Sequence, residues 1–247
     1  MAGSMDGVTK TKYHAVLDLH SRRRKALKIE RLLDLSERRE PLKLIEIGTG
    51  SGGIAHYFAR HSTLRFDVTA VDVVDLRVVR GGFEFKLVQG TKLPFSDAFF
   101  DVVLSNHVIE HVGRTRDQRD HLREMYRVMK PEGIGYLATP NRWMFIEPHY
   151  RLPFLSWLPR SMRHDYVRAM KKGDYYDCEP LSLWTLERHL KDAGFHYENL
   201  ALPALHETLR MEMGYEFLAQ AAGKIPRWLF RSLHLLVPTL VYRLKKG

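Results

Sequence analysis

Apolar and polar residues follow two different rhythms along the first 140 residues. Short apolar runs predict buried strands at 42–48, 66–74, 83–90, 100–106 and 133–141. Apolar residues at helical spacing predict helices at 13–38, 51–62 and 118–133, and the fourth strand is expected to run on into a helix over 107–112. Because short apolar strands alternate with helices, the pattern predicts an α/β fold with a doubly wound, mostly parallel sheet.

The rhythm changes after Asn141. Residues 142–180 are rich in aromatic residues and prolines without a clear period, and we expect them to form a lid over the ligand-binding edge of the sheet. A helix is expected over 182–195 and a further strand over 196–202. Residues 225–247 are apolar with spaced basic residues, which predicts an amphipathic tail that lies at a membrane surface or packs on the domain, rather than a membrane span.

These changes divide the chain into five expected parts. They are an N-terminal helical segment at 1–40, in which 1–4 look like an expression remnant before Met5, a cofactor-binding core at 41–141, the lid at 142–180, the end of the core at 181–224, and the basic tail at 225–247.

Composition and charge limit which ligands and macromolecules the chain is expected to bind. The net charge of +10 permits contact with nucleic acid or an anionic membrane, but aromatic motifs that read bases are absent from the sequence. The single cysteine, Cys178, excludes an intrachain disulfide and a zinc site built from cysteines. Glu147 and His149 make an incomplete metal site, so no metal is expected. No secretory apolar segment is recognised, which favours a cytoplasmic protein.

The glycine-rich stretch LIEIGTGSGGIAHYF offers more than one ligand. Gly48, Gly50 and Gly53 match G-x-G-x-x-G, which is typical of dinucleotide binding, and Asp72 is placed to bind a ribose diol. A P-loop is excluded because no Gly-Lys-Ser/Thr follows. Glu46 before the loop suits a ligand with an ammonium group better than a pyrophosphate. The glycines alone therefore leave an NAD-type oxidoreductase open.

A second block, LPFSDAFFDVVLSNHVIEHV at 93–112, favours another family. With Glu46, the glycine loop and Asp72, it resembles the class I S-adenosylmethionine-dependent methyltransferases of the type 11 branch, over about residues 42–141. The resemblance implies a seven-stranded Rossmann-like sheet and S-adenosyl-L-methionine as cofactor. It implies cofactor contacts from Glu46, Gly48, Thr49, Gly50, Gly52, Asp72, Val73, Gln89, Gly90, Asn106 and His107. Gln89 stands where the family usually has an aspartate that accepts from the adenine amino group.

Methyl transfer requires an acceptor in line with the methyl group, and a hydroxyl acceptor requires a base. The catalytic candidates are His107, His111 and His149, with His111 expected one helical turn after His107. Tyr13, Trp143 and Tyr150 are expected to bind substrate, although packing within the lid is the alternative for its aromatic residues.

The sequence therefore predicts a methyltransferase that acts on a hydroxyl, or less readily a carbon, of a small molecule, glycoconjugate or lipid-linked acceptor. The tail suggests peripheral contact with the inner face of the membrane through 225–247. An RNA methyltransferase, supported by the net charge, and an NAD-type oxidoreductase are the alternatives.

Overall fold

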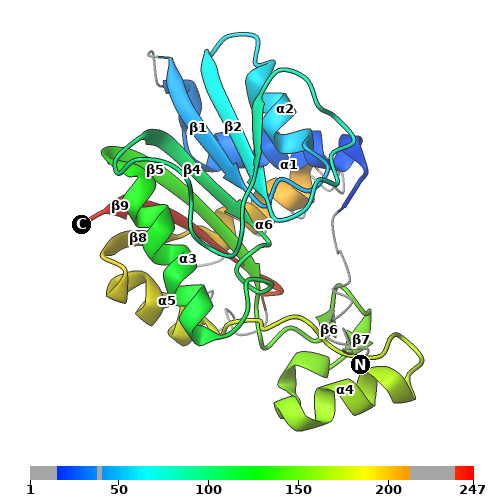
Figure 1. Cartoon of the computed structure of the whole chain (residues 1–247). Helices are drawn as coiled ribbons and strands as arrows, with labels where there is room; N and C mark the ends of the chain where they lie inside the picture. The colour runs from blue at the N-terminus through cyan, green and yellow to red at the C-terminus, as the bar shows by residue number, and fades with distance from the viewer. Residues whose placement is uncertain (1–15, 38–40, 212–236) are drawn as a thin grey trace, which may run out of the picture.

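The computed structural model describes residues 16–37, 41–211 and 237–247, and its centre is one large sheet (Figure 1). The strands of this sheet are β1 (Leu42–Ile47), β2 (Phe66–Asp72), β3 (Glu84–Leu87), β4 (Phe100–Asn106), β5 (Met129–Pro140), β8 (Phe195–Asn199) and β9 (Thr239–Lys246). They lie in the order β3-β2-β1-β4-β5-β9-β8. β9 runs antiparallel to both of its neighbours, and the other paired strands are parallel. The predicted seven-stranded, mostly parallel sheet is confirmed.

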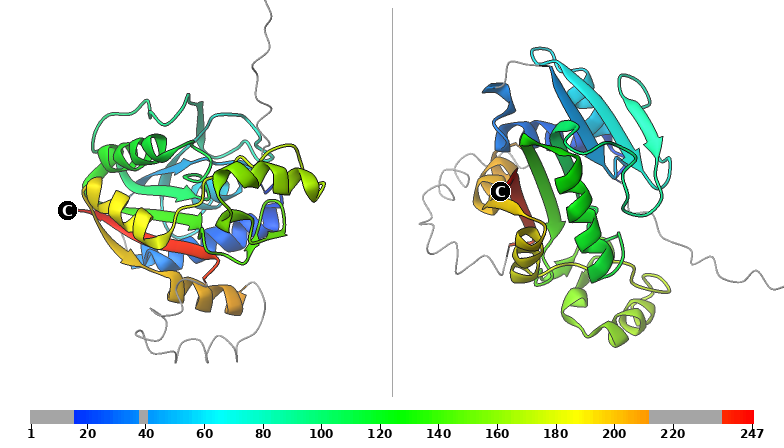
Figure 2. Two further views of the ribbon diagram at one scale, coloured as in Figure 1. Left: turned by 90° about the horizontal axis from the view of Figure 1, so that it is seen from below. Right: turned by 60° about the vertical axis from the view of Figure 1, so that its left-hand side comes forward.

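Helices cover both faces of the sheet, as Figure 2 shows. They are α1 (Leu19–Leu32), α2 (Gly53–Ala59), α3 (Thr115–Val128), α5 (Leu183–Asp192) and α6 (Ala201–Met211), and a 3-10 turn, η1, spans Leu35–Glu37. α1, α2 and α6 contribute to one apolar cluster, whereas α3 and α5 contribute to a second. Alternate residues of one strand serve the two clusters: Leu104 faces the first and Val103 the second.

Local chemistry explains where two of these helices begin. Asp18 caps α1 by accepting hydrogen bonds from the backbone N–H groups of His20 and Ser21. Ser182 caps α5 in the same way, by accepting from the N–H of Thr185. Neither cap needs a contact from elsewhere in the chain.

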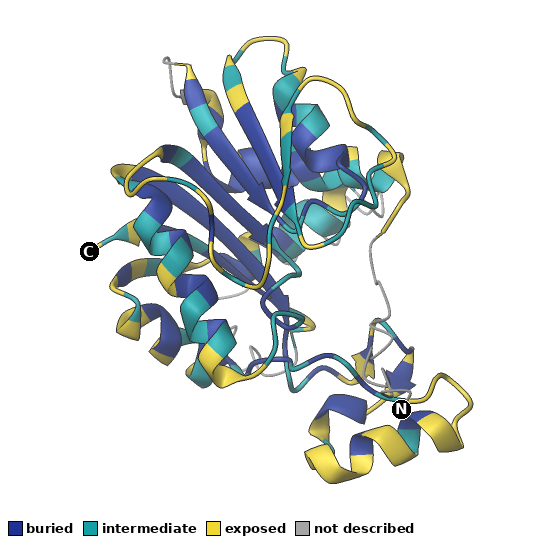
Figure 3. Ribbon diagram, viewed as in Figure 1, coloured by how far each residue is buried: buried dark blue, intermediate teal, exposed yellow. Residues whose placement is uncertain are grey.

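The lid residues form a small unit that lies beside the carboxyl ends of the strands (Figure 1). It contains the hairpin β6 (Ile146–Glu147) and β7 (Leu152–Pro153), the turn η2 (Leu155–Trp157) and the helix α4 (Arg160–Ala169). Its helix has a mostly exposed outer side, as Figure 3 shows. The lid keeps its own apolar cluster, which consists of Tyr150, Leu152, Leu155, Val167, Tyr176 and Cys178.

Two expectations are wrong in the structure. Residues Thr239–Lys246 of the predicted tail form β9, in which Leu240, Tyr242 and Leu244 are buried between β5 and β8, so this part of the tail is a strand inside the domain rather than a segment at a membrane surface. The remainder of that tail, 225–236, lies outside the described residues. Residues 107–112 form turns instead of a helix, because His107 takes a positive φ of 59° directly after β4.

Among the described residues no helix is both long and apolar enough to cross a membrane.

Candidate active site

The glycine loop after β1 adopts a conformation that side chains would block. Gly48, Gly50 and Gly52 all have positive φ angles, of 71°, 53° and 78°. A Cβ atom on Gly48 would lie 2.4 Å from Cγ2 of Val108, and one on Gly52 would lie 2.5 Å from the carbonyl oxygen of Val79. The loop is therefore held against the segment after β4, and its glycines leave room for close approach of a ligand to the backbone.

Glu46 is almost fully buried beneath this loop. Its Oε2 accepts a hydrogen bond from the hydroxyl of Thr49 at 2.7 Å and another from the N–H of Ala55, in α2, at 2.9 Å. Burial raises the pKa of Glu46 to about 8, although both hydrogen bonds act in the opposite direction. The side chain thus fixes the start of α2, and Oε2 is the oxygen that both bonds use.

Asp72 lies at the carboxyl end of β2 and faces the same loop. Its carboxylate accepts from the N–H of Gly50 at 2.9 Å and from the N–H of Val73 at 2.8 Å. Each carboxylate oxygen keeps a further lone pair that could accept from a hydroxyl. Val73 is 62% exposed, and Gln89 and Gly90 are exposed in the loop after β3, so this end of the sheet is open.

The segment after β4 brings a polar network to the neighbouring strand ends. Within the described chain, the buried Oδ1 of Asn106 has no hydrogen-bond partner. His107 Nδ1 lies 3.4 Å from Oε1 of Glu110, a fully buried carboxylate whose Oε2 accepts from the hydroxyl of Thr139 on β5. Burial acts to raise the pKa of Glu110, but the interactions with His107 and the charge of His111 outweigh it and lower that pKa.

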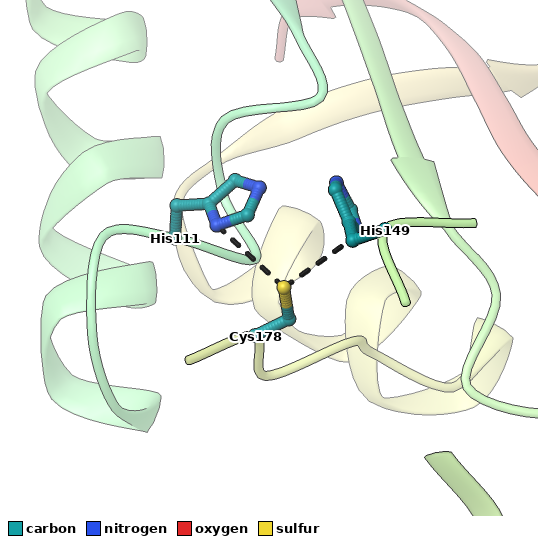
Figure 4. Close-up of side chains that lie close together, drawn as sticks. All are labelled: His111, His149 and Cys178. Atoms are coloured by element: carbon teal, nitrogen blue, oxygen red, sulfur yellow. Dashed lines mark hydrogen bonds between the residues drawn. The ribbon is translucent and has the colours of Figure 1, made fainter. Parts of the chain in front are cut away.

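His111, His149 and Cys178 meet although they are far apart in the sequence (Figure 4). The Cys178 sulfur lies 3.7 Å from Nδ1 of His111 and 3.6 Å from Nδ1 of His149, and the two imidazole rings pack edge to face at 4.9 Å. Nδ1 of His149 also lies 2.7 Å from Oε1 of Glu147. Burial acts to lower the pKa of His149, but Glu147 outweighs it and raises that pKa. Burial raises the pKa of the Cys178 thiol.

The structure describes two of the three residues that were expected to bind substrate. Tyr150 is 3% exposed, and its hydroxyl lies within hydrogen-bonding distance of Oδ1 of Asp177 and of the carbonyl oxygen of Tyr175, so its placement favours the packing interpretation. Trp143 is half-buried, and its indole packs against that of Trp157 at 5.6 Å. Tyr13 lies outside the described residues.

Sequence reasoning missed several members of this site. Cys178 was considered only as a partner for other cysteines, and no spacing rule connects positions 111, 149 and 178. Thr139 ends an apolar strand and gave no signal. The sequence pairs Glu147 with His149, two residues later. It does not indicate that the fold brings His111 and Cys178 next to His149.

The methyltransferase resemblance is matched by comparison with known proteins. Residues 45–137 match the family model described as "Methyltransferase domain". A "Ubiquinone biosynthesis O-methyltransferase" of Rickettsia akari is 27% identical over 150 residues, which are 55% of this chain and 56% of the relative. A protein of the same name from Bartonella tribocorum is 28% identical over 191 residues, 72% of this chain and 73% of the relative. The match to the Rickettsia protein thus spans little more than half of that relative.

A solved structure agrees with the fold. "Haemonchus contortus Phosphoethanolamine N-methyltransferase 2 in complex with S-adenosyl-L-methionine" superposes with a TM-score of 0.52 at 20% identity, covering 90% of this chain and 52% of that one. The residues present fit this cofactor: Asp72 can accept from ribose hydroxyls, Asn106 offers an acceptor oxygen without a partner among the described residues, and the glycine loop lacks side chains where the ligand approaches. Residues 45–137 are therefore a methyltransferase domain of the class I family, with S-adenosylmethionine as its cofactor.

Proposed function

We propose that this chain transfers a methyl group from S-adenosylmethionine to a hydroxyl oxygen of a small molecule. The observation that carries the proposal is that the glycine loop and the His107–Glu110 pair lie together at the carboxyl ends of β1 and β4. The close approach of Gly48 to Val108 brings the loop after β1 against the segment that holds His107. The relatives named as O-methyltransferases support oxygen as the acceptor atom.

The cofactor would supply a methyl group already activated on a sulfonium, so the protein's task is to position and deprotonate the acceptor. We assign the ribose hydroxyls to Asp72, whose two oxygens are spread by the N–H groups of Gly50 and Val73. Glu46 is assigned to the ammonium end, because its carboxylate lies directly beneath the loop. Gln89, Gly90 and Val73 border the open end, which suits the adenine.

Of the three candidate histidines, we assign proton acceptance to His107. Its side chain is 30% exposed, whereas its ion-pair partner Glu110 is fully buried. A positive φ of 59° is costly for a histidine, and the bond from its N–H to the carbonyl of Ala138 helps to hold it. Glu110 would stabilise the imidazolium that forms when His107 takes the hydroxyl proton. His111 and His149 are instead engaged with Cys178.

A lipid-linked acceptor is the finer form of this proposal. The lid exposes Phe145, Ile146 and Phe154 to solvent, at 45%, 62% and 47%. Phe145 and Phe154 also contact one another at 5.9 Å between ring centres. Exposed apolar side chains that cluster suit an apolar acceptor or the surface that carries it.

Cofactor binding is tested by titration calorimetry with S-adenosylhomocysteine. Asp72→Ala should weaken binding at least about tenfold, because two charge-assisted hydrogen bonds are lost. Asp67→Ala, an exposed position on the same strand, is the matched control and should bind like the unchanged protein. Binding of NAD without binding of S-adenosylhomocysteine would overturn the proposal in favour of an oxidoreductase.

Methyl transfer is tested with catechols, alkyl alcohols and a structured RNA as acceptors. Release of S-adenosylhomocysteine, with a new O-methyl group seen by mass spectrometry, is expected with a hydroxyl compound. His107→Gln should lower kcat by about 10²-fold or more while S-adenosylhomocysteine binding changes little. Methylation of RNA alone would contradict the small-molecule proposal, and an unchanged kcat in His107→Gln would remove the assigned base.

A further inference from the structure

We propose that His111, His149 and Cys178 bind a divalent transition-metal ion of the zinc type where the lid meets the methyltransferase domain. The three residues come from the turn after β4, from the β6–β7 hairpin and from the segment that returns from the lid to α5. One ligand atom from each lies within 4.8 Å of the other two. Two imidazoles and a thiolate are ligands that zinc prefers.

The two sulfur–nitrogen distances suit such an ion, and the two nitrogen atoms lie within 4.8 Å of one another. A tetrahedral zinc with usual bonds to sulfur and nitrogen holds those two atoms about 3.6 Å apart. The Cys178 sulfur lies 3.7 Å from Nδ1 of His111 and 3.6 Å from Nδ1 of His149. Both separations therefore match the edge of one tetrahedron.

A hydrogen-bonded cluster accounts for the same contacts less well. A thiol has one proton, so it can donate to only one of the three groups near it, which are Nδ1 of His111, Nδ1 of His149 and, at 3.5 Å, Oδ1 of Asp177. Nδ1 of His149 already lies 2.7 Å from Glu147 Oε1, so a proton shared between these two atoms leaves that nitrogen unable to accept from the thiol. An ion at Nδ1 would displace this proton, and Glu147 would then be an anionic group within reach of a fourth ligand position.

The surroundings of the cluster are acidic. Glu147 and Glu110 are fully buried carboxylates, and both, together with Asp177, act electrostatically on His149. Cys178 is itself 1% exposed. Buried carboxylates around nitrogen and sulfur ligands favour a bound cation over an empty site.

An ion here would connect two parts of the molecule. The lid already meets the domain through a hydrogen bond from the N–H of Glu179 to the carbonyl of Glu110, at 2.8 Å. His111 belongs to the domain, and His149 and Cys178 belong to the two ends of the lid. Coordination would therefore fasten both ends of the lid to the strand edge, whether or not methyl transfer follows the proposal above.

The test uses the full chain without a purification tag, stripped with a chelator and then dialysed against Zn²⁺ or Co²⁺. We expect one equivalent of metal by elemental analysis, and a thiolate-to-cobalt charge-transfer absorption for the Co²⁺ form. His111→Ala, His149→Ala and Cys178→Ser should each weaken Zn²⁺ binding at least about tenfold, and Cys178→Ser should also lose the charge-transfer band. His196→Ala, an exposed histidine on β8, is the matched control and should keep both signals.

Two results would overturn the proposal. One is an unchanged protein that retains less than a tenth of an equivalent of Zn²⁺ and shows no cobalt–thiolate band. The other is binding that persists in all three ligand variants, which would place the ion elsewhere. Because the unchanged protein is measured directly, the outcome does not depend on whether a variant folds, and a Zn²⁺-dependent rise in Tm provides a second readout.

Discussion

The part of the sheet that contains the methyltransferase domain at 45–137 and the lid residues at 142–180 are stabilised in different ways. The core fills both faces of the sheet with aliphatic side chains, among them Leu44, Val103 and Leu104, which are fully buried. The lid has one small apolar cluster and buries polar groups beside it, namely Glu147, Ser156 and Arg163. We infer from this difference that buried apolar area stabilises the core, whereas the lid depends on a few hydrogen bonds and ion pairs. Opening the lid should therefore cost less free energy than unfolding the core.

The largest contrast should come from removing one leucine in each part. Leu104→Ala, in β4, should lower the free energy of unfolding by about 3 kcal/mol, because a buried leucine leaves a cavity in the sheet. Leu155→Ala should mainly speed hydrogen exchange within the lid and leave the global midpoint in urea nearly unchanged. An equal global loss from both changes would show that the core and the lid unfold as one unit.

A smaller effect is expected from the buried guanidinium of the lid. Arg163 is 3% exposed and donates to the carbonyls of Leu158 and Ser156, so Arg163→Ala should destabilise the lid by about 2 kcal/mol, because buried acceptors lose their partner. Limited proteolysis within 142–180 measures the opening. Arg168→Ala, on the exposed side of α4, is the control and should resist the protease like the unchanged protein.

A buried histidine of the core should behave oppositely to His149. Burial lowers the pKa of His121 to about 4, and its Nε2 bonds the hydroxyl of Ser105 at 2.9 Å. In the unfolded chain the pKa of this histidine is about 6.5, so the unfolded chain binds more protons between these two values. Its contribution to stability is therefore full above about pH 6.5 and falls as the pH drops toward 4. From pH 7 to 5 the loss attributable to His121 is about 2 kcal/mol.

Urea unfolding at both pH values measures this loss, and His121→Gln should remove most of it. The exposed His196→Gln serves as the comparison and should retain the full pH dependence. If His121→Gln loses as much stability on acidification as the unchanged protein, the burial of a neutral imidazole does not govern this part of the acid response.

The smallest expected effect concerns Glu46, and it separates cofactor binding in the core from metal binding at the lid. Its pKa of about 8 means that an ammonium can pair with it only after a proton is lost, so S-adenosylhomocysteine affinity should rise about tenfold from pH 6 to 7. Glu46→Gln should abolish this rise while Zn²⁺ content stays unchanged. A pH-independent affinity in the unchanged protein would remove the assignment of Glu46 to the ammonium.

The same contrast explains what could be predicted from the sequence. The core strands were found because apolar runs such as 42–47 and 100–106 reflect burial on both faces, and the glycine loop was found because backbone geometry restricts the residue type. His111 was placed on a helix because its spacing from His107 fits one turn, and a single positive φ at His107 changed the path of the chain.

The lid was recognised by its composition, but its internal contacts were not. Tyr150 and Asp177 are 27 residues apart, and their hydrogen bond depends on how α4 turns the chain back. The strand β9 was missed for a related reason, since an apolar segment with spaced basic residues has the same composition at a membrane surface and in a sheet. Pairing with strands that are distant in the sequence decides between a surface segment and a strand, and the local pattern of apolar residues contains no information about that pairing.

The position of β9 has a consequence for how the molecule is assembled. Among the described residues, β8 joins the sheet through β9 alone, and β9 follows it by some forty residues in sequence. Until residues 239–246 are available, β5 keeps an unpaired edge along Gly135–Pro140, and β8 has no partner strand. A chain that is still being synthesised therefore passes through a stage with an open, apolar sheet edge, at which pairing with another copy competes with completion of the fold.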